Sequence, residues 1–121
     1  MPIIYVATLG QRPEAITVAF DRLNDQYHYE AIAVLHTEPH ISGIAQAFAD
    51  LQAVCAHDYP NIVTHFHEIA YEDGTPLIDI SDQHSAEAYH RAVLGRIYQY
   101  KQSGYDIHLM VAGGRKAMSI Y

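Results

Sequence analysis

The feature that most constrains the fold is an apolar run ending in glycine, which occurs near each end of the chain. Residues 3–9 (IIYVATL) form the first run and lead into Gly10, and residues 107–112 form the second and lead into two glycines. Runs of this length that are rich in β-forming residues are typical of buried strands in a parallel sheet. We therefore expect two buried strands, each followed by a glycine-containing loop and a helix.

The loop after the second run has the composition of an anion-binding turn. Gly113 and Gly114 are followed by Arg115 and Lys116, and residues 117–119 suit a helix. Glycine allows a sharp turn and a close approach of a ligand, while the first N–H groups of a helix lack intrahelical partners. The loop predicts a phosphate site, and a tight turn with exposed basic residues is the alternative for so short a motif.

Strand-like and helix-like segments alternate between the two runs. Helical spacing begins at Pro13 and continues to about Leu23. Further along the chain we expect a strand at 29–36, a helix from 41 to 55, a strand at 61–69 near a sheet edge, a loop at 71–82 with a short strand at 77–80, a helix from 81 or 82 to 102, and a strand at 106–112. The alternation predicts one α/β domain, an open, mostly parallel Rossmann-like sheet with helices on both faces.

The two glycine loops both follow the carboxyl ends of strands, where ligands bind in open α/β sheets. Residues 10–13 and residues 113–116 would face one crevice if their strands are neighbours in the sheet. The chain stops at Tyr121, about a turn into the last expected helix. We therefore expect either a domain truncated at this end or a part of a longer protein.

The excess of acidic residues argues against some classes of binding partner. The chain carries seven Lys and Arg against fourteen Asp and Glu, a net charge of −7, which argues against broad binding to DNA, RNA or an anionic membrane surface. Three of the cations, Arg12, Arg115 and Lys116, nevertheless fall just after the two apolar runs. The single cysteine, Cys55, and the lack of a signal-peptide or membrane-spanning pattern favour a cytoplasmic setting.

With both loops in view, the sequence resembles the CARF (CRISPR-associated Rossmann fold) domains, which sense cyclic oligoadenylates in type III CRISPR defence. IIYVATLGQRPEAIT at 3–17 is similar to the opening strand, loop and helix of that family, and HLMVAGGRKAMS at 108–119 to its glycine-glycine-basic-lysine turn. Leu35, His36 and Thr37 match the family's usual strand-end position after the second strand. The chain is thereby identified as a single CARF-like domain over residues 1–121, similar to the ring nucleases.

The resemblance implies a homodimer with one cyclic oligoadenylate, most often the tetramer, lying across the two-fold axis. It implies phosphate binding by Lys116 and by the backbone of Gly113, Gly114 and Arg115. Ligand contacts would also come from the first loop and from the end of the second strand, namely Thr8, Leu9, Gly10, Gln11, Arg12, His36 and Thr37. No metal or other cofactor is implied.

Two activities remain open within this resemblance. Ring nucleases cleave the bound ring by attack of a ribose 2′-OH on its own phosphate, which leaves a 2′,3′-cyclic phosphate and switches off type III CRISPR signalling. Lys116 would stabilise the phosphorane and Gln11 would orient the ribose, as the candidate catalytic residues. Some ring nucleases use a serine in the first loop, which is lacking here. The alternative is therefore a non-catalytic sensor domain of a larger effector, whose effector domain this sequence does not contain.

Other residues carry weaker signals. His65 and His67 would share one face of a strand and could hold Zn²⁺, but two ligands are too few and no other His or Cys clearly completes the site. We therefore expect a polar strand face without a metal. Tyr89 and Tyr100 on the long expected helix suit core or dimer contacts. A generic nucleotide-binding enzyme is disfavoured because the first loop has no Gly-x-Gly-x-x-Gly motif and the chain has no Walker motif.

Overall fold

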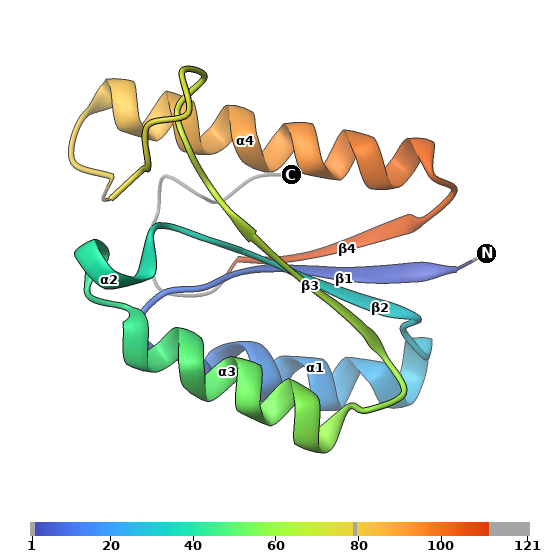
Figure 1. The fold of residues 1–121 in the computed structure, drawn as a ribbon. Helices are drawn as coiled ribbons and strands as arrows, with labels where there is room; N and C mark the ends of the chain where they lie inside the picture. The colour runs from blue at the N-terminus through green and yellow to red at the C-terminus, as the bar shows by residue number, and fades with distance from the viewer. Residues whose placement is uncertain (1, 79, 112–121) are drawn as a thin grey trace.

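The structure, a computed structural model, describes residues 2–78 and 80–111. These residues form a four-stranded parallel sheet in the order β3-β2-β1-β4 with helices on both faces (Figure 1). Its strands are β1 (Ile3–Thr8), β2 (Ala31–His36), β3 (Val63–Glu68) and β4 (Asp106–Val111). Its helices are α1 (Glu14–Tyr27), α2 (Pro39–Ser42), α3 (Ala45–Asp58) and α4 (Gln83–Gln102). The predicted α/β architecture is confirmed, and β3 lies at a sheet edge as expected.

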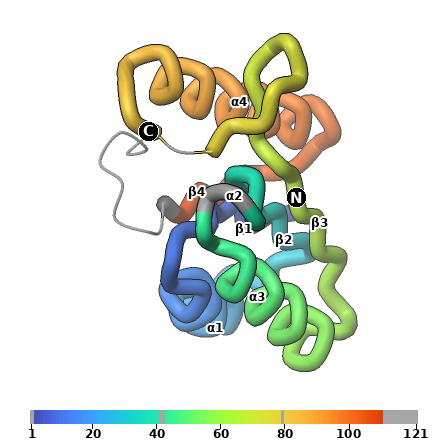
Figure 2. The backbone as a smooth tube through the Cα atoms, turned by 60° about the vertical axis from the view of Figure 1, so that its left-hand side comes forward, coloured from blue at the N-terminus to red at the C-terminus, as the bar shows by residue number. Residues whose placement is uncertain are grey.

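The helices cover the sheet from two sides. Figure 2 shows α1 and α3 below the sheet and α4 above it. Successive side chains of a strand point to opposite faces, so β1 supplies both cores: Tyr5 and Ala7 pack toward α1 and α3, and Ile4 and Val6 pack toward α4. Every residue of β2 is buried, because this central strand is covered on both faces.

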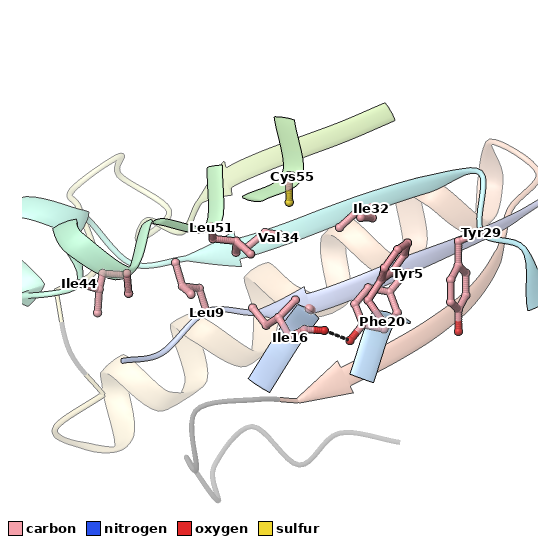
Figure 3. Packing of buried hydrophobic residues seen from close by; sticks show 12 residues of the cluster. Tyr5, Leu9, Ile16, Phe20, Tyr29, Ile32, Val34, Ile44, Leu51 and Cys55 are labelled. Carbon is pink, nitrogen blue, oxygen red and sulfur yellow. Dashed lines mark hydrogen bonds between the residues drawn. The ribbon is translucent and has the colours of Figure 1, made fainter. Parts of the chain in front are cut away.

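Aromatic rings fill much of the core between the sheet and helices α1 and α3 (Figure 3). The ring of Tyr5 meets Phe20 edge-on with centroids 5.2 Å apart, and the Tyr5 hydroxyl donates a hydrogen bond to the Ile16 carbonyl oxygen at 3.0 Å. Cys55 is buried in the same cluster, where it is a small core residue. Burial raises the pKa of the Cys55 thiol to about 11, so the thiol stays protonated and unreactive.

The predicted start of a helix at residue 41 is wrong, because the chain forms two helices in this region. Gly43 has a φ of +82°, a left-handed conformation that ends α2 and that favours glycine. The longer helix, α3, begins only at Ala45 and continues to Asp58. The local apolar spacing correctly predicted a helix, but it did not indicate the left-handed conformation of Gly43 that separates α2 from α3.

The short strand expected at 77–80 is also wrong, since residues 77, 78 and 80 have no strand structure. An isolated antiparallel bridge joins Ala70 to Pro76 instead, around a turn in which Gly74 has a φ of +89°. Leu77 is fully buried against the α4 side of the sheet. Its apolar character therefore reflects an anchor for this loop and not a strand.

The N-terminus of α4 is closed by a reciprocal cap. The Asp82 carboxylate accepts the Ser85 backbone N–H at 2.8 Å, and Ser85 Oγ accepts the Asp82 backbone N–H at 3.1 Å. The hydrogen bond from Ser85 lowers the pKa of Asp82, so the cap stays ionised at neutral pH. The expected start of the long helix at 81 or 82 is thereby confirmed, and α4 begins on the side where the strands end (Figure 1).

Candidate functional site

The two strands that precede the glycine loops are hydrogen-bonded neighbours. Thr8, the last residue of β1, is paired with Val111, the last residue of β4, and Ala7 is paired with Met110. The condition for a shared crevice, that these strands lie side by side, is therefore met. Gly113, Gly114, Arg115 and Lys116 lie outside the described residues, and the described part of β4 ends two positions before Gly113.

The first loop brings only part of its predicted contacts to the surface. Thr8 and Leu9 are 1% and 5% exposed, and the Leu9 N–H donates to the Leu35 carbonyl oxygen at 2.9 Å. Gln11 and Arg12 are exposed, and Gly10 is half-buried. We conclude that Gly10, Gln11 and Arg12 form the accessible part of this loop, while the side chains of Thr8 and Leu9 belong to the core.

The start of α1 fixes the far side of this loop. The Ala15 N–H donates to the Arg12 carbonyl at 3.2 Å, and the Ile16 N–H donates to the Pro13 carbonyl at 3.0 Å. Pro13, with φ −63°, fits the first turn, and the positive end of the helix dipole points toward the loop. The Arg12 side chain is 80% exposed, with Nε 3.7 Å from Glu14 Oε1, so this pair is weak and leaves the guanidinium accessible to an anion.

The side chain of His36 is buried against α3 and is not exposed at the end of β2. It is 4% exposed, its ring centroid lies 4.5 Å from that of Phe48 on α3, and its Nδ1 lies 2.8 Å from the Thr37 carbonyl oxygen. Burial lowers the pKa of His36, so the ring is neutral at pH 7 and its Nδ1–H donates to Thr37. His36 therefore supplies no positive charge. Its hydrogen bond to the carbonyl oxygen instead holds the backbone of the half-buried Thr37.

The strand-end loop after β2 also contains contacts that sequence reasoning missed. The Glu38 N–H donates to the Leu77 carbonyl oxygen at 3.1 Å, and the Glu38 carboxylate accepts the His40 N–H at 3.1 Å. A carboxylate thus lies near the edge where anion binding was expected. The sequence could have indicated this carboxylate, because Glu38 directly follows Thr37. It could not have indicated the backbone partner Leu77, which is 39 positions away.

The two histidines of β3 lie together on the side that faces α4. The rings of His65 and His67 are stacked with centroids 6.0 Å apart, and His67 Nε2 lies 2.6 Å from the Tyr100 hydroxyl. Within residues 2–78 and 80–111, no group of three or more His, Cys, Asp or Glu side chains is arranged to hold a metal ion. Tyr89, which lies on α4 as Tyr100 does, is a core residue and is 2% exposed.

His67 makes the stability of the fold depend on pH. Burial, followed by the positive charge of Arg96, lowers its pKa to about 4 from an ordinary value of 6.5. Below pH 6.5 the unfolded chain therefore binds a proton that the folded protein excludes, and stability falls as the pH drops toward 4. Because His67 is only half-buried, we expect a loss of about 1 kcal/mol between pH 7 and pH 5, measured by urea unfolding at each pH.

Matched variants isolate this contribution. His67→Gln keeps a polar side chain without a titrating ring, and we expect it to remove most of the pH dependence assigned to this site. His57→Gln is the control, because the His57 side chain is 90% exposed. A pH dependence in His67→Gln equal to that of the unchanged protein would contradict the assignment.

A groove adjoins the first loop along the side of α1 that borders β4. It has a volume of about 500 Å³ and reaches from Arg12 to Leu23, with Met110 of β4 among the residues that line it. Its α1 wall is largely apolar and includes Val18, which is 61% exposed. The surface around Gln11 and Arg12 therefore continues from a polar loop into an apolar groove.

The sequence matches the model of a known protein family. Residues 12–121, about nine-tenths of the chain, match the family model described as "CRISPR-associated protein NE0113 (Cas_NE0113)". The matched range includes Arg12 and residues 113–116. No curated protein matches the chain. None of the helices in the described part of the chain has the length and apolar character needed to cross a membrane.

Proposed function

The chain belongs to the Cas_NE0113 family of CRISPR-associated proteins, and we propose that it binds a cyclic oligoadenylate, preferentially cyclic tetra-adenylate, and cleaves the ring. The observation that carries the proposal is the pairing of β1 with β4, with Thr8 opposite Val111. This pairing brings the strand that leads to Gln11 and Arg12 beside the strand that precedes the sequence Gly-Gly-Arg-Lys. Both sequences suit phosphate groups, and a cyclic oligonucleotide presents several phosphates at once.

Local charge supports an anionic ligand despite the acidic chain as a whole. Arg12 is exposed beside the positive end of α1, and Arg115 and Lys116 add two further cations in the sequence that follows β4. The remaining cations, Arg22, Arg91, Arg96 and Lys101, belong to α1 and α4. A net charge of −7 opposes extended nucleic acids, while a small ring with few phosphates can be held by these local cations.

The symmetry of the ring favours a homodimer as the binding unit. A cyclic tetramer of identical nucleotides has two-fold symmetry, so two copies of one loop can make the same contacts to opposite phosphates. We propose that two chains share one ring, with the carboxyl ends of their strands facing it. Phosphate contacts from Lys116 and the Gly113–Gly114 backbone then come from both chains, as do the contacts from Gln11 and Arg12.

Cleavage needs no external nucleophile. A ribose 2′-oxygen forms a bond to the adjacent phosphorus, the bond from phosphorus to the 5′-oxygen breaks, the 2′-hydroxyl loses its proton and the departing 5′-oxygen gains one. Gln11 would orient the ribose so that attack is in line, and Lys116 would offset the charge of the phosphorane. His36 is not proposed as the base, because its Nδ1–H is engaged by Thr37 and its ring packs on Phe48.

The test is incubation of the pure protein with cyclic tetra-adenylate in EDTA, followed by chromatography of the nucleotides. We expect linear products that end in a 2′,3′-cyclic phosphate, which would remove the signal that type III CRISPR effectors sense. An intact ring that co-elutes with the protein would favour the non-catalytic sensor and overturn cleavage alone. An intact ring without binding would overturn the whole proposal.

A further inference from the structure

Tyr5 lies in the middle of β1 and carries a hydroxyl group in a fully buried position. The side chain is 0% exposed, and its hydroxyl donates to the Ile16 carbonyl oxygen at 3.0 Å. A buried phenol requires such a partner, since an unsatisfied hydroxyl is costly to bury. The bond links β1 to α1 across 11 residues of sequence, and these residues include the whole first loop.

The hydroxyl contributes something that ring packing does not. The Tyr5 ring contacts Phe20 and Tyr29, with centroids 5.2 and 5.3 Å away. Phenylalanine would preserve both contacts, because only the ring takes part in them. The hydrogen bond is therefore the property that distinguishes tyrosine from phenylalanine here, and it acts on α1 at Ile16 (Figure 3).

Ile16 is itself bonded to the loop. Its N–H donates to the Pro13 carbonyl oxygen at 3.0 Å, and the neighbouring Ala15 N–H donates to the Arg12 carbonyl oxygen at 3.2 Å. On the other side of the loop, the Leu9 N–H is held by the Leu35 carbonyl oxygen at 2.9 Å. Both ends of the loop are therefore held by hydrogen bonds. The Leu9 end is bonded to the sheet, and the Ile16 end is bonded to the Tyr5 hydroxyl.

We propose that Tyr5 is a positioning residue for the ligand site: its hydroxyl holds the first turn of α1 against β1 and thereby places Gln11 and Arg12 for binding. The ligand in this inference rests on the proposed function, whereas the positioning of the first turn of α1 does not. Tyr5 itself is buried and touches no ligand.

The variant that tests this is Tyr5→Phe, which keeps the ring and removes one oxygen atom. We expect about a fivefold loss of affinity for cyclic tetra-adenylate, the effect of one lost hydrogen bond on a loop that must then be ordered by the ligand. We also expect the amides of Ala15 and Ile16 to exchange with solvent about fivefold faster, measured by nuclear magnetic resonance and compared with β2 amides to correct for global unfolding.

The matched control is Tyr29→Phe. The Tyr29 hydroxyl also has a hydrogen-bond partner, since it lies 2.7 Å from Nδ1 of the half-buried His108, and the Tyr29 ring belongs to the same cluster. Figure 3 shows Tyr29 on the far side of Tyr5 from Leu9 and Ile16. The Tyr29 hydroxyl is bonded to His108 and not to the first loop. Its removal should therefore leave both the ligand affinity and the amide exchange of Ala15 and Ile16 within about twofold of the unchanged protein.

The outcomes separate the inference from the proposed function. Lower affinity and faster exchange in Tyr5→Phe, with neither in Tyr29→Phe, would support positioning. Equal effects in the two variants, or unchanged exchange at Ala15 and Ile16 in Tyr5→Phe, would overturn it. If the unchanged protein binds no ring, the proposed function fails, and the exchange comparison alone decides whether Tyr5 positions the loop.

Discussion

Replacement of Lys116 by alanine is expected to weaken the binding of cyclic tetra-adenylate by roughly a hundredfold or more, because each chain of the proposed dimer loses a charge-assisted hydrogen bond to a phosphate. Two chains contact one ring in the proposed dimer, so one substitution removes two such bonds. The measurement is a calorimetric titration at one fixed salt concentration, since added salt weakens the same contacts. Cleavage should fall in addition if Lys116 also stabilises the phosphorane.

The chain offers a matched control for this charge change. Lys101 is the only other lysine in the sequence, and it lies exposed in the last turn of α4. Lys101→Ala lowers the net charge by the same amount as Lys116→Ala but leaves the proposed site unchanged. Equal affinities in the two variants would mean that total charge governs binding, and they would contradict a phosphate contact by Lys116.

Phe20→Ala is expected to produce the largest loss of stability, about 3–5 kcal/mol in the free energy of unfolding. Phe20 is 1% exposed, and its ring centroid lies 5.2 Å from that of Tyr5 and 4.6 Å from that of Tyr59. Truncation removes these contacts and leaves a cavity between α1 and the sheet that the surrounding rings cannot fill. The measurement is urea unfolding monitored by tyrosine fluorescence and circular dichroism.

Val18→Ala is the control on the same helix. Val18 is 61% exposed, so its truncation removes little buried area and should change the free energy of unfolding by less than about 0.5 kcal/mol. It also lies on the wall of the groove beside Arg12, so its effect on ligand binding shows whether the groove takes part in the site. Similar destabilisation in Phe20→Ala and Val18→Ala would contradict the placement of Phe20 at the centre of this core.

The placement of His36 changes how charge is assigned at the site. From the sequence it was a candidate for contact with the ligand, whereas in the fold it is neutral, packed on Phe48 and hydrogen-bonded to the Thr37 carbonyl oxygen. The described cation at this edge is Arg12, and the carboxylate of Glu38 lies on the chain that follows β2. In the proposed site, the ligand therefore depends on the cations of the two glycine loops and gains no charge from His36.

The sequence by itself determined the features that depend on neighbouring residues. Apolar periodicity distinguished strands from helices, because side-chain direction repeats every two residues in one and every 3.6 in the other. The alternating polarity of residues 61–69 indicated an edge strand, which the position of β3 confirms. The pairing of Asp82 with Ser85 is likewise local, since a cap is formed within one helical turn.

Tertiary structure alone decided what lies beside what. Thr8 and Val111 are paired although 103 positions separate them, because β4 returns to the opposite side of β1 from β2. The same order sets which strand-end side chains are buried: Leu9 packs under α1 and α3, and His36 packs on Phe48. A strand pattern shows that a residue lies at a carboxyl end, but the register and the covering helices decide whether its side chain faces a ligand or the core.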